Sequence, residues 1–520
     1  MRTTIGATVA AVLTALAAMS SLRADGPELL DRNLAVRTLA SGLTTPISMA
    51  FLDANDMLVL EKDTGKVQRV IDGVVQANAV LDLAVNNNSE RGLLGIALHP
   101  SFPDDPGVYL YWTCRSSAAP TDPFFPDEER CLDANMFAAD TNDILMVPLL
   151  GNRVDRFVWN GSTLVFDRNL IMLRAFQNDG APIPVGQGDE AQPARGNHDG
   201  GVLRFGPDEK LYIQFGDNGR RGQLQNLPCG PTAVTCPGTV TADDQFGGPE
   251  PDDAHLTGVI LRLNPDGTTP TDNPFYRAGA SMGGEVGANI QKIFAYGVRN
   301  GFGMAFDPRS GMLWEQENGD DAFSEINLAE PGFNSGWVQI MGPPERLGQY
   351  KAIETDPTAP QPFAPAGYFG LQQLRWSPVN IADSPAEALS RLFMLPGARY
   401  SAPEMSWKFE VSPAAIAFLD SSALGPNYDG NLFVGAARTF LEGGHLFRLR
   451  LTGNRRQIAV DDPRLRDRVA DNVNKWDITE SESLLFGRNF GVATDMHTSP
   501  DGTLVVVSLS NGAIYEIVRR

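Results

Sequence analysis

The feature that most constrains the fold of this 520-residue chain is a short pattern that recurs six times. Each copy is an apolar run, a turn built from Pro, Asp, Asn or Gly, and a second apolar run, which is typical of a β-hairpin. A third apolar run often follows, as in GKVQRVI, TGVILRLN, GHLFRLRL and NGAIYEIV. The six copies begin near Ala50, Ala97, Phe205, Ala305, Ala417 and His497.

Six similar units of three or four strands predict an all-β fold, namely a six-bladed β-propeller of four-stranded antiparallel sheets. A two-sheet sandwich is the alternative, but it accommodates six similar hairpins less readily. Long loops around residues 115–145, 220–255 and 340–400 make the spacing irregular. Because propellers commonly close by pairing the two chain ends, we expect the N-terminal run LAVRTLASGL to join the last blade.

The stretch MRTTIGATVAAVLTALAAMSSLRADG predicts a secretory signal peptide over residues 1–24, followed by a single domain over residues 25–520. A membrane anchor is the alternative, but the apolar run is short and no stop-transfer pattern follows it. We therefore expect a periplasmic or secreted protein. The net charge of −21 argues against nucleic-acid binding and is compatible with a bound divalent cation.

The four cysteines of the chain are predicted to form disulfides, because an even count in an exported protein favours them. The expected pairs are Cys114–Cys131 and Cys229–Cys236, each of which closes a local loop. The CxxC spacing of a zinc site is absent from the sequence. We interpret these disulfides as structural bonds that hold local loops closed.

The third copy of the repeat lies within GNHDGGVLRFGPDEKLYIQFGDNG and carries a histidine before its hairpin and an aspartate after it. Residues equidistant from a hairpin turn are cross-strand neighbours. The turn is centred near Asp208, with His198 ten residues before it and Asp217 nine residues after it. We therefore expect His198 and Asp217 to lie side by side at the open end of this hairpin.

The same arithmetic places other polar residues at the open ends of their hairpins. Arg299 and Gly319 flank the turn near Arg309 at equal distances, Arg438 ends the fifth hairpin, and Glu90 begins the second. Blades related by rotation bring all these ends to one face. The mouth of the predicted propeller is then ringed by His198, Asp217, Arg299, Gly319, Arg438 and Glu90, and propeller sites usually lie at such a mouth.

The chemistry of these residues is compatible with a site, although each also has a structural interpretation. A lone histidine is more often structural, but a place on the shared rim favours a functional role for His198. Asp217 is either a turn former or the carboxylate that orients His198. Arg299 is either solvated or stabilises charge. The ENGDD segment offers oxygen ligands that suit calcium. We interpret the remaining histidines as structural, namely His99, His255, His445 and His497.

Five segments together resemble the soluble quinoprotein sugar dehydrogenases, which use pyrroloquinoline quinone (PQQ). The segments are ERGLLGIALHPSF, HDGGVLRFGPDEKLYIQFGD, LTGVILRLNPDGTTPTDNPF, YGVRNGFGMAFDP and EINLAEPGFNSGW. The resemblance runs from about residue 40 to the C-terminus with gaps at the inserted loops. It implies a six-bladed propeller that oxidises an aldose sugar or related alcohol, with hydride transfer to a calcium-bound quinone.

The resemblance also implies roles for individual residues. His198 matches the histidine that takes the proton from the sugar hydroxyl, and Asp217 matches the partner that holds its imidazole in the base-competent tautomer. Arg299 matches the arginine over the quinone. These three are the predicted catalytic residues.

Cofactor contacts are likewise carried over from the resemblance. Quinone-binding positions match Glu90, Asn300 and Arg438. The backbone carbonyls that hold calcium match Gly319 and Asp320, where calcium would polarise the quinone as a Lewis acid. The expected cofactors are therefore PQQ and Ca²⁺.

The last blade departs from the family pattern. The family carries two arginines shortly before the SPDG turn, whereas this chain has Val492 and Thr494 there. Because PQQ has three carboxylates, losing two cations should weaken its binding, and Arg488 is the nearby residue that would replace them. The departure favours an alternative, a propeller that binds carbohydrate or protein at the same mouth or hydrolyses a substrate with calcium. The chain has no CxxCH haem motif to relay electrons, so the electron acceptor stays unassigned.

Overall fold

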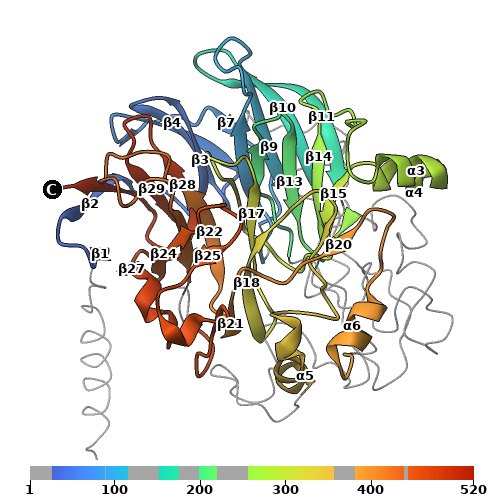
Figure 1. Cartoon of the computed structure of the whole chain (residues 1–520). Helices are drawn as coiled ribbons and strands as arrows, with labels where there is room; N and C mark the ends of the chain where they lie inside the picture. Colours follow the sequence, from blue (N-terminus) through green and yellow to red (C-terminus); the bar gives the residue numbers. More distant parts are fainter. Residues whose placement is uncertain are drawn as a thin grey trace, which may run out of the picture.

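Figure 1 shows the computed structural model of the chain. The structure describes residues 26–87, 89–114, 151–173, 175, 198–218, 256–355, 381–437 and 443–520. The predicted signal peptide, Arg438, His255 and three of the four cysteines lie outside these residues. Cys114 is buried and disulfide-bonded, and the predicted pairing with Cys131 stays a prediction.

The described strands form six sheets, and each sheet contains one of the six predicted hairpins. All six hairpin predictions are therefore confirmed. The hairpins are β3 (Pro46–Asp53) with β4 (Asp56–Glu61), β8 (Leu93–Leu98) with β9 (Gly107–Thr113), β12 (Leu203–Phe205) with β13 (Leu211–Phe215), β16 (Gly303–Phe306) with β17 (Leu313–Glu317), β22 (Pro413–Phe418) with β23 (Leu432–Ala436), and β28 (Ala493–Thr498) with β29 (Leu504–Ser508).

A third strand pairs antiparallel with the second strand of each hairpin. In chain order these third strands are β5 (Lys66–Ile71), β10 (Asn152–Trp159), β14 (Val259–Leu263), β18 (Ala322–Leu328), β24 (His445–Leu451) and β30 (Ala513–Arg519). Further strands lie outside them: β6 (Val74–Val75) and β7 (Leu81–Asp82), β11 (Leu164–Leu173), β15 (Ile293–Tyr296), β21 (Met405–Phe409), β27 (Leu485–Arg488) and β2 (Leu34–Ser41).

The sheets follow one another around a ring, which is the propeller arrangement. The first strands of successive sheets are in contact, from β3 to β8, β12, β16, β22 and β28, and β28 contacts β3 again. The prediction of an all-β propeller is confirmed. The expected closure is also confirmed, because β2 near the N-terminus pairs antiparallel with β30 at the C-terminus, as Leu34 opposite Arg519 illustrates.

Four antiparallel strands recur in each of the six sheets, as predicted. The prediction does not include the further short strands that bring four of the six described sheets to five or six strands. Short extra strands lie at the outer edges: β1 (Glu28–Leu29), β19 (Phe333–Asn334), β20 (Arg399–Tyr400), β25 (Ile458–Ala459) and β26 (Val469–Ala470). Three of them, β19, β20 and β26, pair in parallel. The connections between sheets thus cover edge backbone groups that would otherwise stay unpaired.

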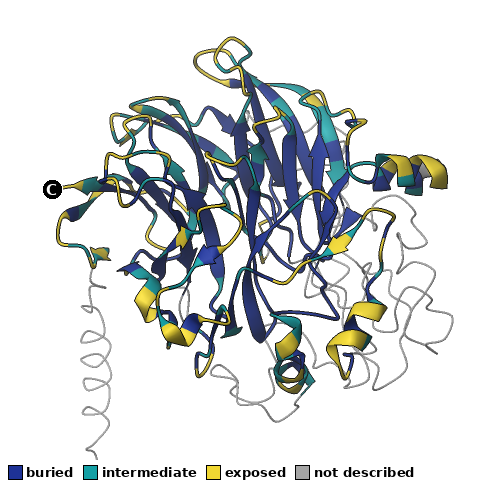
Figure 2. Cartoon of the chain, in the orientation of Figure 1, coloured by how far each residue is buried: buried dark blue, intermediate teal, exposed yellow. Residues whose placement is uncertain are grey.

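Apolar clusters fill the interfaces between neighbouring sheets. One cluster joins Leu110 of β9 to Leu58 of β4, and another joins Trp314 of β17 to Val434 of β23. Figure 2 shows buried strands and exposed loops and helices at the periphery. The inner strands are buried on both faces, as β13 and β29 illustrate, whereas outer strands such as β11 are partly exposed.

The described α-helices are short and lie outside the ring. They are α3 (Tyr276–Met282), α4 (Gly284–Ile290), α5 (Leu347–Thr355) and α6 (Pro385–Arg391), all labelled in Figure 1. Among the described residues, no helix has the length and apolar character needed to cross a bilayer.

Candidate functional site at the His198–Asp217 pair

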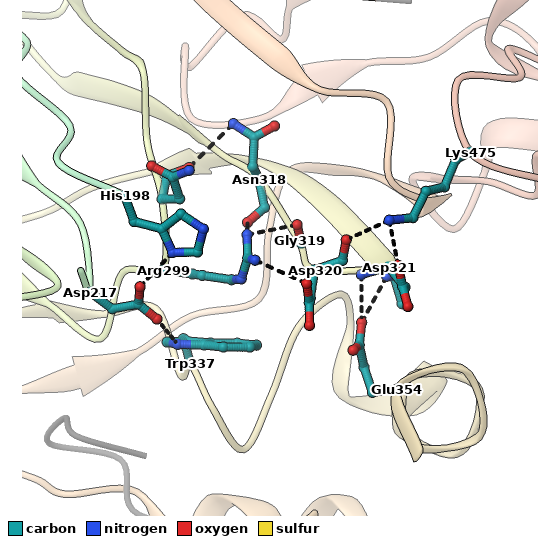
Figure 3. Close-up of polar contacts among 12 residues, drawn as sticks. His198, Asp217, Arg299, Asn318, Gly319, Asp320, Asp321, Trp337, Glu354 and Lys475 are labelled. Carbon is teal, nitrogen blue, oxygen red and sulfur yellow. Dashed lines mark hydrogen bonds and ion pairs between the residues drawn. The ribbon is translucent and has the colours of Figure 1, made fainter. Parts of the chain in front are cut away.

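His198 and Asp217 form a buried hydrogen-bonded pair. Nδ1 of His198 lies 2.6 Å from Oδ1 of Asp217 (Figure 3). His198 precedes β12 and Asp217 follows β13, so both lie at the open end of one hairpin. The side-by-side placement expected from the turn is confirmed.

The backbone holds this pair in a tight loop crossing. His198 has a φ of 63°, a left-handed conformation that costs about 1–3 kcal/mol in a residue other than glycine and is common at functional sites. Gly216 passes so close that a Cβ there would lie 2.3 Å from the carbonyl oxygen of His198. The N–H of Asp217 donates to the carbonyl of Arg299 at 2.8 Å. A glycine at 216 therefore lets His198, Asp217 and Arg299 converge.

Trp337 holds the second oxygen of the aspartate. Its indole Nε1 donates to Oδ2 of Asp217 at 2.8 Å, and its side chain is fully buried. Trp337 comes after β19, so hairpin arithmetic does not place it, and the sequence analysis missed it. The only available signal was its position in EINLAEPGFNSGW, one of the family-like segments.

Arg299 is also buried and extends the pair toward the ENGDD loop. Nη1 donates to the carbonyls of Asn318 at 2.9 Å and Gly319 at 2.8 Å, and Nη2 donates to Oδ1 of Asp320 at 3.1 Å. The guanidinium carbon lies 5.4 Å from the centre of the Trp337 ring. His198, Asp217, Trp337 and Arg299 thus form one connected group, which we call the His198 cluster.

Glu90 and Asn300 join this cluster through its backbone. Oε2 of Glu90 accepts from the N–H of His198 at 2.6 Å and from Nδ2 of Asn300 at 3.2 Å. Two predicted cofactor contacts therefore lie beside His198, although they come from chain segments 210 residues apart. The third predicted contact, Arg438, lies outside the described residues.

The two carbonyls predicted to bind calcium are already hydrogen-bonded to protein cations. Gly319 accepts from Arg299, and the carbonyl of Asp320 accepts from Nζ of Lys475 at 2.9 Å. Calcium prefers six to eight oxygen ligands, and positive groups in its first shell oppose it. Within the described residues, no group of three or more His, Cys, Asp or Glu side chains is arranged to hold a metal. As it stands, this loop does not fit a calcium ion.

The expected replacement of the two family arginines by Arg488 is wrong. Arg488 lies on β27, an outer strand, where its side chain is 46% exposed and its Nε is 3.8 Å from Oε2 of Glu28. Val492 instead packs in a small apolar cluster with Ala414 and Ala437. β27 is the fourth strand of its sheet counted from β22, which lies in the inner ring of first strands, so Arg488 is far from the His198 cluster and adds no cation to it.

Comparison with known proteins decides the family. The model of the Glucose / Sorbosone dehydrogenase family matches residues 43–123 and 188–371, just over half of the chain. The chain belongs to this family. The quinoprotein glucose dehydrogenase B of Acinetobacter calcoaceticus is 28% identical over 314 residues, which is 60% of this chain and 53% of that protein. The aldose sugar dehydrogenase YliI of Escherichia coli is 26% identical over 326 residues, 62% and 61% of the two chains.

The fold agrees with this family membership. The structure of the PQQ-bound form of an aldose sugar dehydrogenase from Streptomyces coelicolor superposes with a TM-score of 0.52 at 20% identity, covering 94% of this chain and 99% of that chain. The aligned part of this chain spans between half and two thirds of the two curated relatives. The resemblance noted in the sequence is thus confirmed at the level of family and fold.

Acidic groups of this dehydrogenase-family chain lie buried beneath the His198 cluster. Glu317 accepts from the N–H of Arg299 and from Oγ of Ser335 at 2.7 Å, and it pairs across the strands with Glu325. Burial, together with the neighbouring carboxylates, raises the pKa of Glu317 well above its usual range. Burial also raises the pKa of Glu315, two residues earlier, to about 8. The cluster therefore sits on carboxyl groups that favour the protonated form.

Removing one of these groups should change how stability depends on pH. A raised folded-state pKa contributes stability that is complete below the unfolded pKa and is lost as pH rises through the folded pKa. Wild-type stability should therefore fall between about pH 4.5 and pH 8. In Glu315→Gln the free energy of unfolding should fall less steeply with pH, by up to about 1.4 kcal/mol per pH unit. The reason is that the glutamine binds no proton in either the folded or the unfolded state.

Urea unfolding at several pH values measures this slope. The glutamine can be accommodated because its neighbour Gln214, which donates to Glu315 at 3.1 Å, has its own Oε1 without a hydrogen-bond partner among the described residues. Glu345→Gln, at an exposed position, is the matched control and should leave the slope unchanged. Parallel pH profiles for Glu315→Gln and wild type would refute the expectation.

Proposed function

We propose that this chain is a PQQ-dependent dehydrogenase that oxidises an aldose sugar or a related alcohol at the His198 cluster. Membership of the Glucose / Sorbosone dehydrogenase family supports the reaction class. The observation that carries the proposal is the buried His198–Asp217 pair, held by Trp337 and placed against Arg299. A base, its orienting carboxylate and a cation are the groups that this chemistry needs.

His198 is the general base in this proposal. A carboxylate only accepts hydrogen bonds, so Nδ1 of His198 carries its hydrogen toward Asp217 and Nε2 keeps a free lone pair. Nε2 takes the proton of the substrate hydroxyl as the carbon–oxygen double bond forms. The tryptophan donor fixes Asp217, and Asp217 in turn fixes the tautomer of His198.

Polar atoms near the base fit an anionic, carbonyl-bearing cofactor. Nε of Arg299 is buried without a hydrogen-bond partner among the described residues, and it can donate to an anionic or carbonyl oxygen. Oδ1 of Asn300 is likewise unpartnered there, and as an acceptor it suits an N–H or O–H group of the cofactor or substrate. When bound, PQQ supplies the acceptor for the hydride that leaves the substrate carbon, so an aldose becomes a lactone. Arg299 and Asn300 would hold it, and Glu90 positions Asn300. Because Val492 stands where the family has an arginine, we expect PQQ to bind more weakly here than at a site that has this arginine.

Several finer features belong to the same proposal. We infer that each of the six sheets is one blade, because their first strands contact one another in an unbroken ring. Residues 25–520 then form one domain, and residues 1–24 form a signal peptide that sends the protein to the periplasm or out of the cell. The substrate is a small molecule, and electrons pass on to an acceptor that the chain itself does not identify. Calcium has no step in this proposal.

Titration of the purified full chain with PQQ tests the function. Quinone binding at micromolar concentration, followed by absorbance, and aldose-dependent reduction of a dye are the expected results. A chain that binds sugars but neither binds quinone nor reduces the dye would instead be a carbohydrate-binding propeller, and the proposal would be abandoned.

A further inference from the structure

Lys475 reaches the ENGDD loop from a distant part of the chain. It lies between β26 and β27, and its Nζ contacts the carbonyl of Asp320, 155 residues away. The ammonium also forms an ion pair with Oδ1 of Asp321. The side chains of Lys475 and Asp321 are only 4% and 2% exposed. Figure 3 shows the lysine pointing at the loop from the side opposite His198.

The loop is held in place around this cation. Oε1 of Glu354, on α5, accepts from the N–H groups of Asp321 and Ala322, each at 2.9 Å. Arg299 occupies the neighbouring carbonyl of Gly319. Arg299 and Lys475 therefore contact the two carbonyls at which the family resemblance implies a divalent ion. Glu354 holds the loop that carries these carbonyls.

We propose that Lys475, together with Arg299, takes the place of the metal, so that quinone binding at this site does not depend on calcium. The inference rests on the proposed function, because it concerns how the same cofactor is held. It assigns a role to a lysine that the sequence analysis did not single out.

The chemistry of an ammonium group supports this substitution. It is a compact charge with three donors, and the contacts to Asp320 and Asp321 use two of them. The ammonium also interacts electrostatically with the buried carboxylate of Glu410, so it has at most one donor for an anionic or carbonyl oxygen of a ligand. A calcium ion bound to the carbonyl of Asp320 would have to displace Lys475, and one that also bound the carbonyl of Gly319 would have to displace Arg299. Each displaced cation would stay buried beside a divalent charge.

Metal-dependent and metal-free binding can be separated directly. The full chain is stripped of metal and titrated with PQQ, once in excess EGTA and once in excess calcium, with tryptophan fluorescence as the signal. Wild type should bind equally well in both. Lys475→Met should bind at least about tenfold more weakly in EGTA, which is the loss expected for a charged hydrogen bond, and calcium should restore its binding.

A second arm omits the quinone. Calcium alone is titrated calorimetrically into the metal-free proteins. Lys475→Met opens the carbonyl of Asp320 beside the carboxylate of Asp321, so this variant should bind one more calcium ion than wild type. Lys475→Met/Asp321→Asn removes both charges, so it should stay folded even if the single variant does not, and it should lose the added calcium site while keeping weak quinone binding.

A matched lysine controls for general effects. Nζ of Lys351 likewise contacts a backbone carbonyl, that of Ile381 at 2.8 Å, and a carboxylate, that of Asp383 at 2.5 Å, but it lies on α5. Lys351→Met should leave both titrations unchanged. Lys475→Arg, which keeps the charge, should keep metal-independent quinone binding within a few-fold.

The outcomes distinguish the two proposals. Wild-type quinone binding that is lost in EGTA and regained with calcium would overturn the role of Lys475, as would a Lys475→Met chain that binds calcium no better than wild type. If no variant binds quinone with or without calcium, the proposed function fails, and the calcium titration still decides whether Lys475 occupies a metal site.

Discussion

Replacing His198 by alanine is expected to lower turnover of the quinone-loaded protein by about 10²- to 10⁴-fold, the usual contribution of a general base. Quinone affinity should change only a few-fold, because in the proposed mechanism the imidazole acts on the substrate hydroxyl. Its contact with Asp217 is a side-chain interaction at the end of a hairpin, so the sheet beneath should stay folded. Steady-state dye reduction and quinone titration measure the two quantities separately.

A second histidine–aspartate pair provides the control. Nε2 of His497 lies 2.9 Å from Oδ2 of Asp495, but this pair is on β28 next to its turn, at the opposite end of a hairpin. His497→Ala should leave turnover within a few-fold of wild type. If His198→Ala lost no more activity than His497→Ala, His198 would not be the base.

Replacing Asp217 by asparagine should be almost as damaging, by about 10³- to 10⁴-fold in kcat, because it selects the wrong tautomer. The indole of Trp337 can only donate, so it fixes the amide oxygen of the new side chain. The amide nitrogen then faces Nδ1 of His198 and donates to it. The hydrogen of the imidazole moves to Nε2, which can no longer accept the substrate proton.

This reasoning predicts a rescue. In Asp217→Asn/Trp337→Phe the indole no longer fixes the amide oxygen, so the amide can turn and present that oxygen to His198. Turnover should then recover in part relative to Asp217→Asn alone. Trp337→Phe by itself should cost much less, because the aspartate still accepts from His198. A double variant no faster than Asp217→Asn would contradict the role given to Trp337.

Hairpin geometry is the part of this molecule that the sequence predicts well. Turn residues and alternating apolar runs mark each hairpin, and antiparallel pairing makes partners equidistant from the turn. That is why the sequence alone pairs His198 with Asp217 and places Arg299 near Gly319. The outer strands were less predictable, because short segments such as β26 carry too few residues to show a pattern.

Hairpin geometry does not predict the positions of Trp337 and Lys475. Trp337 follows a two-residue strand, and Lys475 lies in a loop between sheet segments, so neither has a cross-strand partner from which its position follows. The predicted calcium at Gly319 and Asp320 rested on the oxygen ligands of the ENGDD segment and on the family resemblance. It could not anticipate that a lysine 155 residues later occupies one of them.

The most direct test of the central claim is a single turnover. The chain is loaded with one equivalent of PQQ without oxygen or dye, an aldose is added in excess, and the absorbance of the bound quinone is followed. We predict that one quinone is reduced per chain and that His198→Ala reduces it at least about a hundredfold more slowly while carrying the same amount of quinone. A loaded wild-type chain whose quinone spectrum no aldose changes, or an equal rate in both proteins, would contradict this account.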